Sequence, residues 1–236
     1  MGAIATLRID YTKASASLLA AMLPTISEGT LDLEPGTEVL LRQQTWEDYE
    51  TLLERRQDNA ALKITFDAAT REIRIMAPLP GHGHRSAALM NFVQAMLIAR
   101  KKDWSVYHPT TLKRFRQKGV EPDTCLYIQN AQAVLGKDRI DLEIDPPPDL
   151  VLEVDLTSLT KIEDYEPIGV PEVWIYQSAE LSIYLFDGQH YQLSTESSAF
   201  PEIPVKQLIP KYVERGWAVP SSVALKEFQA ELQRLG

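Results

Sequence analysis

The run Leu150-Val-Leu-Glu-Val154 constrains the fold of this chain more than any other segment, because it is apolar on both of its faces. A strand with this pattern is covered on both sides and lies in the interior of a sheet. Three consecutive prolines at positions 146–148 end the preceding loop just before the run begins. The sequence therefore predicts a layered protein with this segment as a central strand.

The segments around this run alternate between helical and extended patterns. Thr45 and Asp48 have the spacing of a capping box at the start of a predicted helix. Helices are expected at residues 45–56, 84–100, 161–168, 205–215 and 221–235, and strands at 62–66, 73–75, 104–107, 111–116, 123–128, 172–176, 181–186 and 191–193. Loops or turns are expected at 78–83, 117–119 and 131–148. This alternation predicts an α/β (α+β) domain with a mixed sheet flanked by helices.

The composition excludes several classes of protein. The 236 residues suit one domain of generous size, and no apolar run approaches the roughly 20 residues that cross a bilayer. A single cysteine, Cys125, cannot form an internal disulfide or, with four histidines, a typical zinc site. The net charge of −9 excludes whole-molecule attraction to phosphate, so any nucleic-acid contact requires a local basic patch or a metal ion. We expect a cytoplasmic protein without a membrane partner.

Glu153 is the anomaly in the apolar run. Side chains two apart on a strand share a face, so Asp149, Glu153 and Asp155 are expected to point the same way. Buried like charges repel one another, and a divalent cation would remove this conflict. A strand end that reaches solvent at Asp155, with Glu153 bonded to a lysine, explains the pattern equally well. The strand alone leaves both interpretations open.

A second acid favours the metal site. Asp123 follows Glu121 and Pro122 at the start of a predicted strand, and pairing with the central strand would bring Asp123 and Glu153 to one cation. Oxygen ligands without a Cys or His cluster suit Mg²⁺ or Mn²⁺. Residues 113–118 are basic and would suit a phosphodiester, although a solvated hairpin face explains them as well.

Together these residues resemble the Uma2 family, also called DUF820, which is abundant in cyanobacteria. The resemblance runs from about residue 44 to about residue 215 and rests on the order and spacing of several short motifs. These motifs are Thr45-Trp-Glu-Asp-Tyr49, Ala77-Pro-Leu-Pro-Gly-His-Gly-His84, Glu121-Pro-Asp123, Pro148-Asp-Leu-Val-Leu-Glu-Val154, Lys161 with Tyr165, and Gly169-Val-Pro-Glu-Val-Trp174.

The resemblance implies a restriction-endonuclease-like fold of the PD-(D/E)XK superfamily, a Mg²⁺-dependent phosphodiesterase site and a homodimer. Asp123 matches the first acid of the superfamily motif and Glu153 the second. Asp155 stands where the superfamily usually has lysine, and Lys161 takes that role in this family. Thr160 is expected to cap the following helix, and the Lys161 ammonium is expected to point towards Glu153, although a solvated surface lysine is the simpler alternative.

These observations predict three segments: an N-terminal extension (1–44) packed on the domain, an endonuclease-fold domain (45–215) and a C-terminal helix (216–236). The expected function is Mg²⁺- or Mn²⁺-dependent hydrolysis of DNA. Two alternatives remain: a catalytically inactive module that binds nucleic acid or a protein, and a hydrolase of another phosphate ester. The candidate site consists of the metal ligands Asp123 and Glu153, the catalytic Lys161, and Arg114, Arg116 and His84 on the substrate.

Overall fold

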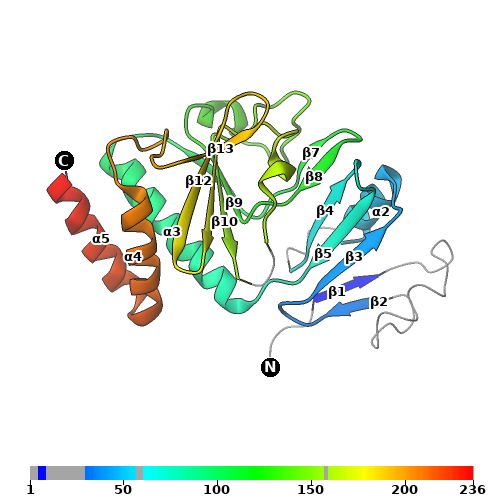
Figure 1. The fold of residues 1–236 in the computed structure, drawn as a ribbon, viewed down its shortest axis with the longest axis horizontal. Helices are drawn as coiled ribbons and strands as arrows, with labels where there is room; N and C mark the ends of the chain where they lie inside the picture. Colours follow the sequence, from blue (N-terminus) through cyan, green and yellow to red (C-terminus); the bar gives the residue numbers. More distant parts are fainter. Residues whose placement is uncertain (1–4, 9–29, 57–60, 157–158, 236) are drawn as a thin grey trace. The chain divides into compact units, whose positions relative to one another are not determined.

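The chain divides between Leu79 and Pro80 into two units (Figure 1). Each unit has its own cluster of buried apolar side chains. The computed structural model describes residues 5–8, 30–56, 61–156 and 159–235. Both units combine helices and strands, so the expected α+β class is confirmed. The expected border at residue 44 lies inside the first unit, and residues 1–4 and 9–29 of the expected extension lie outside the described residues.

The first unit, Met1–Leu79, is built from antiparallel strands and one described helix. β5 pairs antiparallel with both β3 and β4, and β1 pairs antiparallel with β2. The elements are β1 (Ala5–Arg8), β2 (Thr30–Leu33), β3 (Glu38–Arg42), α2 (Trp46–Arg56), β4 (Lys63–Asp67) and β5 (Glu72–Met76). The hairpin expected at residues 62–75 is confirmed.

The capping box at the start of α2 forms as the sequence predicts. The Thr45 N–H donates to Asp48 Oδ2 at 2.9 Å, and the Asp48 N–H donates to Thr45 Oγ1 at 3.2 Å. These bonds satisfy N–H groups that a helix leaves without partners in its first turn. The apolar face of α2 places Trp46 edge-on against Tyr49 and Phe66, with ring centroids 5.4 and 5.7 Å away.

The second unit, Pro80–Gly236, contains a six-stranded sheet in the order β13-β12-β11-β10-β9-β6. β10 and β11 are parallel, and the other neighbouring pairs are antiparallel. The six strands of this sheet are β6 (Ser105–Tyr107), β9 (Thr124–Tyr127), β10 (Leu150–Asp155), β11 (Glu172–Gln177), β12 (Glu180–Phe186) and β13 (Tyr191–Ser194). The unit also contains the strands β7 (Leu112–Arg114) and β8 (Lys118–Val120). Its helices are α3 (Pro80–Ala99), α4 (Val205–Ala218) and α5 (Ser221–Leu235), with 3₁₀ helices η1 (Ala131–Val134) and η2 (Ile162–Tyr165).

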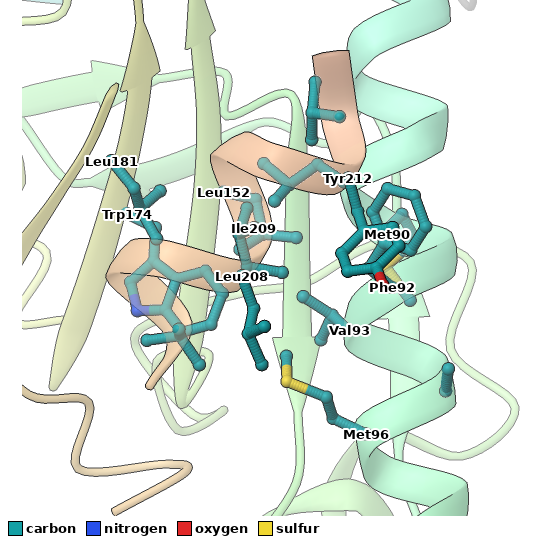
Figure 2. Close-up of a cluster of buried hydrophobic side chains, with 14 of the residues drawn as sticks. Met90, Phe92, Val93, Met96, Leu152, Trp174, Leu181, Leu208, Ile209 and Tyr212 are labelled. Atoms are coloured by element: carbon teal, nitrogen blue, oxygen red, sulfur yellow. The ribbon is translucent and has the colours of Figure 1, made fainter. Parts of the chain in front are cut away.

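Both faces of β10 are buried, as the apolar run predicts. Leu152 packs with side chains of α3 and α4, including Val93 and Leu208, and Trp174 of β11 lies in the same cluster (Figure 2). Val151, on the opposite face, belongs to a second cluster. The prediction of a central strand is therefore confirmed, and its opposite face carries Glu153.

The expected loop at 78–83 is wrong, because α3 already begins at Pro80. Proline has no N–H to lose at the first helical position and its φ suits a helix, so it starts helices as well as breaking them. Gly81, His82 and Gly83 therefore lie in the first turn of α3. This difference decides which histidine reaches the candidate site.

Two further expectations in the second unit need correction. The expected turn at 117–119 lies at residues 115–117, where Arg116 has φ +55°, and Lys118–Val120 is strand β8, paired antiparallel with β7. The expected helix at 161–168 is the short 3₁₀ helix η2, and Gly169 with φ +77° follows it. The turn between β7 and β8 differs from the expected one because polar residues in a tight β-hairpin obscure the extended pattern on either side of the turn.

Candidate active site

Strands β9 and β10 bring Asp123 and Glu153 to the same face of the sheet. The strands are antiparallel with Cys125 opposite Val151, which confirms the expected pairing. Asp123 lies two residues before Cys125, and Glu153 two residues after Val151, so both continue that face. Cross-strand neighbours lie within reach of one another's side chains. The two acids therefore meet although 30 residues separate them in the sequence.

Each carboxylate is bound by the backbone of the other's strand. The Asp123 N–H donates to Glu153 Oε2 at 3.1 Å, and the Val154 N–H donates to Asp123 Oδ2 at 2.8 Å. Asp123 is 7% exposed and Glu153 is 6% exposed. Because these bonds run both ways between two buried strands, they hold the two carboxylates as one unit.

Tyr165 and His82 also contact the two acids. The Tyr165 hydroxyl, on η2, donates to Glu153 Oε1, and His82 Nε2, on the first turn of α3, lies 2.9 Å from Asp123 Oδ2. Burial raises the pKa of the Tyr165 hydroxyl, and the charge of Glu153 raises it further, so this group remains a donor. Donors from separate elements thus stabilise the buried negative charges.

Sequence reasoning missed His82 and selected His84. The His84 side chain is exposed, and its ring meets the Trp217 ring edge-on at 5.1 Å. Residues two apart on an α-helix point in nearly opposite directions, so only one of the two histidines can face Asp123. Recognising Pro80 as the start of a helix would have shown that His82 and His84 project in different directions. A contact of His84 with substrate stays a prediction.

The other two acids of the strand have separate structural roles. Asp149 Oδ2 accepts the backbone N–H groups of residues 128–130 at 2.6, 2.9 and 3.2 Å, which holds the turn after β9. Asp155 accepts the Thr160 N–H at 2.8 Å and the Thr160 hydroxyl at 2.7 Å. Each of the three acids, Asp149, Glu153 and Asp155, therefore accepts hydrogen bonds of its own, which compensate the expected repulsion among them.

Lys161 lies between Thr160, which binds Asp155, and the helix η2, which carries Tyr165, and its side chain is exposed. Its backbone is extended, with φ −90° and ψ 115°, and it is itself the N-cap residue of η2. The expected Thr160 cap is wrong, because Asp155 binds the Thr160 side chain instead. The structure does not place the Lys161 ammonium against Glu153, and a catalytic role for Lys161 stays a prediction.

The basic run at residues 113–118 is divided among different surroundings. Arg114 donates through Nε to the Pro167 carbonyl at 3.2 Å and through Nη1 to the Leu142 carbonyl at 2.5 Å. Arg116 is exposed beside Phe115, with its guanidinium carbon 5.2 Å from the ring centroid. Lys118, in contrast, is buried and pairs with Asp164 at 2.6 Å. Substrate contacts of Arg114 and Arg116 stay predictions.

The donor type of Asp123 and Glu153 fits Mg²⁺ or Mn²⁺. Mg²⁺ in proteins is usually held by one or two carboxylates, and waters and substrate phosphate oxygens complete its coordination. Within the described residues there is no group of three or more His, Cys, Asp and Glu side chains arranged to hold a metal ion. Burial raises the pKa of the nearby Cys125 thiol to about 12, so this thiol is neutral at physiological pH.

Comparisons with known proteins identify the family of the chain. Residues 46–219 match the Uma2 family, described as "Putative restriction endonuclease". The chain is also similar to a "putative nuclease belonging to DUF820" from Anabaena variabilis ATCC 29413, with 11% identity, a TM-score of 0.44, and coverage of 64% of this chain and 90% of that chain. No curated protein matches the chain. No described helix is long and apolar enough to span a membrane. Because the family match covers most of the sequence, the chain belongs to the Uma2 family.

Proposed function

We propose that this chain is a Mg²⁺-dependent endonuclease that hydrolyses phosphodiester bonds in DNA. The observation that carries the proposal is the buried pair Asp123 and Glu153, each bound by the backbone of the other's strand. Two carboxylates held side by side are typical protein ligands of a Mg²⁺ ion that acts on phosphate esters. The family description supports the same class of reaction.

In this proposal Asp123 and Glu153 hold the ion, which would polarise the phosphate and lower the pKa of the attacking water. Tyr165 and the Asp123 N–H orient Glu153, and His82 orients Asp123. Such orienting bonds are often as important to a metal site as the ligands themselves. Binding of substrate would bring a phosphate close to Lys161, whose ammonium would then neutralise negative charge that develops at the phosphate.

The experiment combines cleavage with metal binding. Supercoiled plasmid is incubated with the purified chain in Mg²⁺, Mn²⁺ or EDTA, and Mn²⁺ binding is measured by calorimetry without DNA. We expect nicking with either metal, none in EDTA, and one Mn²⁺ per chain. DNA binding without nicking would instead favour the inactive binding module, which is supported by Asp155 at the usual lysine position and its bonds to Thr160. Turnover of a small phosphate ester alone would favour the third class.

Lys161→Ala tests the lysine separately from the metal ligands. Loss of a cation at the developing charge should lower the nicking rate by about 10²-fold or more, and Mn²⁺ binding and the unfolding temperature should not change because the side chain is exposed. Lys226→Ala, which removes an exposed lysine from α5, is the matched control and should cleave normally. Cleavage by Lys161→Ala at the wild-type rate would show that the site works without this lysine.

We also propose a homodimer, since cutting both strands of a duplex suits two sites related by a two-fold axis. β13 is an edge strand of the six-stranded sheet, and its Leu193 is exposed, as is Val223 on α5. Light scattering should give twice the chain mass of 26.6 kDa at micromolar concentration. Leu193→Lys, which places a charge on the edge strand, should reduce that mass. A wild-type mass of one chain would contradict the dimer.

A further inference from the structure

Trp217, near the end of α4, is the most exposed tryptophan of this chain. More than half of its surface, 53%, is exposed, whereas Trp46 and Trp174 are buried and Trp104 is partly buried. Exposure of a large aromatic side chain leaves apolar surface in water without any gain in folding. Tryptophan is also enriched where proteins bind partners. Trp217 is therefore a candidate for contact with a partner molecule.

The Trp217 ring lies against the first turns of α3. The Arg85 guanidinium carbon is 4.1 Å from the ring centroid, and the His84 ring meets it edge-on at 5.1 Å. A Cβ at Gly81 would lie 3.5 Å from Trp217 Cη2, so the indole passes directly over Gly81. His82, the next residue, contacts Asp123. The exposed ring therefore covers the helical turn that carries His82, on the side from which His84 and Arg85 project.

This arrangement is held in place from the sheet. The hydroxyl of Tyr176, a buried residue of β11, donates to Glu214 Oε1 at 2.6 Å. Glu214 Oε1 in turn lies 3.7 Å from Arg85 Nε. Glu214 and Trp217 are three residues apart on α4 and so share one face of that helix. Arg85 and Trp217 are thus positioned before any ligand binds, which reduces the entropy lost on binding.

The chemistry of this group matches one class of ligand. It presents a flat aromatic ring, a guanidinium and an imidazole, on a chain whose net charge is −9. Aromatic faces stack on nucleobases, and nearby cations attract the phosphates that join them. A base inside a duplex has both faces covered by its neighbours, so only an unpaired base can stack in this way.

We propose that Trp217, Arg85 and His84 form a subsite that binds an unpaired nucleotide of DNA beside the phosphodiester site. The proposal rests on the proposed function for its choice of DNA, and it specifies the substrate further. The enzyme would favour single-stranded DNA, or duplex DNA with an unpaired segment, over fully paired DNA. Glu214 opposes the charge of Arg85 in part, so stacking on Trp217 contributes more than charge.

The test measures binding without catalysis. A fluorescein-labelled single-stranded oligodeoxynucleotide is titrated with the full chain in EDTA and low salt, and anisotropy gives the affinity. Wild type should bind the single strand at least about tenfold more tightly than the same sequence as a duplex. Trp217→Ala should lower the affinity for the single strand about tenfold or more, and Trp217→Phe, which keeps a ring, should restore most of it.

Two more variants separate stacking from charge and from general surface effects. Glu214→Gln keeps an acceptor for Tyr176 but removes a negative charge, so it should tighten binding severalfold at low salt. Ile98→Ala removes an exposed apolar side chain at the far end of α3 and should leave the affinity unchanged. Intrinsic fluorescence adds a direct readout, since the single strand should quench wild type more than Trp217→Phe.

The outcomes distinguish this inference from the proposed function. If Trp217→Ala binds the single strand like wild type, or if duplex binds equally well, the subsite is wrong even if the chain cleaves DNA. If wild type fails to cleave DNA but its affinity for the single strand depends on Trp217, the subsite is supported and the proposed nuclease activity is contradicted. If Trp217→Ala changes only the mass in light scattering, the ring is a contact between copies and the inference is wrong.

Discussion

Replacing Glu153 with glutamine is expected to abolish metal-dependent cleavage, with a fall in the nicking rate on the order of 10³-fold or more. Glutamine has nearly the same shape and keeps one oxygen that can accept from Tyr165 or from the Asp123 N–H. The substitution removes a negative charge that attracts a divalent cation far more strongly than a neutral amide oxygen does. Calorimetry with Mn²⁺ alone should therefore also show a large loss of affinity.

Glu172→Gln is the matched control for this prediction. Glu172 is at least as buried as Glu153 and lies on the neighbouring strand β11. It accepts from Trp174 Nε1 and from the Ser198 and Ala199 N–H groups. Its replacement should lower stability but leave cleavage and Mn²⁺ binding per folded molecule unchanged. If Glu172→Gln and Glu153→Gln lose activity equally, burial of a carboxylate and not metal binding explains both, and the metal site is wrong.

Phe228→Ala is expected to cause the largest loss of stability, about 3–5 kcal/mol, because it removes a fully buried ring from the core. The ring lies 4.8 Å from Phe92 of α3 and 5.1 Å from Tyr212 of α4, centroid to centroid. A loss of this size should lower the unfolding temperature by roughly 10 °C, measured by circular dichroism.

The control for this prediction lies on the same helix. Leu235→Ala removes a partly exposed side chain near the end of α5 and should change stability by less than about 0.5 kcal/mol. The comparison also tests whether α5, which follows the residues matched to the family, is part of the core. Equal, small losses for both variants would show that α5 contributes little to this core.

The sequence predicted most elements because local periodicity reports which faces are buried. The run around Val151 and Leu152 is apolar on both faces and forms the central strand β10. The capping box of Thr45 and Asp48 is local in the same sense, because its donors and acceptors lie three residues apart. Where local signals conflict, the prediction fails: Pro80 begins α3, although Pro and Gly around it indicated a loop.

The candidate site was predicted in part from the same patterns. A carboxylate on a buried strand and a second acid at a strand start can both be recognised in the sequence. The strands that place them, β9 and β10, pair as expected. The alternation of Asp149, Glu153 and Asp155 alone does not separate the three acids, and the choice of Glu153 rested on its place inside the apolar run and on the family resemblance. Their hydrogen bonds distinguish them, since Asp149 and Asp155 bind nearby turns and Glu153 binds the segment that carries Asp123.

The sequence by itself thus determined the α+β class, the buried central strand and the choice of Asp123 and Glu153 as the candidate pair of acids. Only the tertiary structure decided that His82 and not His84 reaches Asp123, that Lys118 is buried against Asp164, and that Lys161 is exposed. The physical reason is the range of the interactions. Periodicity reflects burial of neighbours along the chain, whereas contacts such as that between Asp123 and Glu153 depend on strand register and on how separate elements pack.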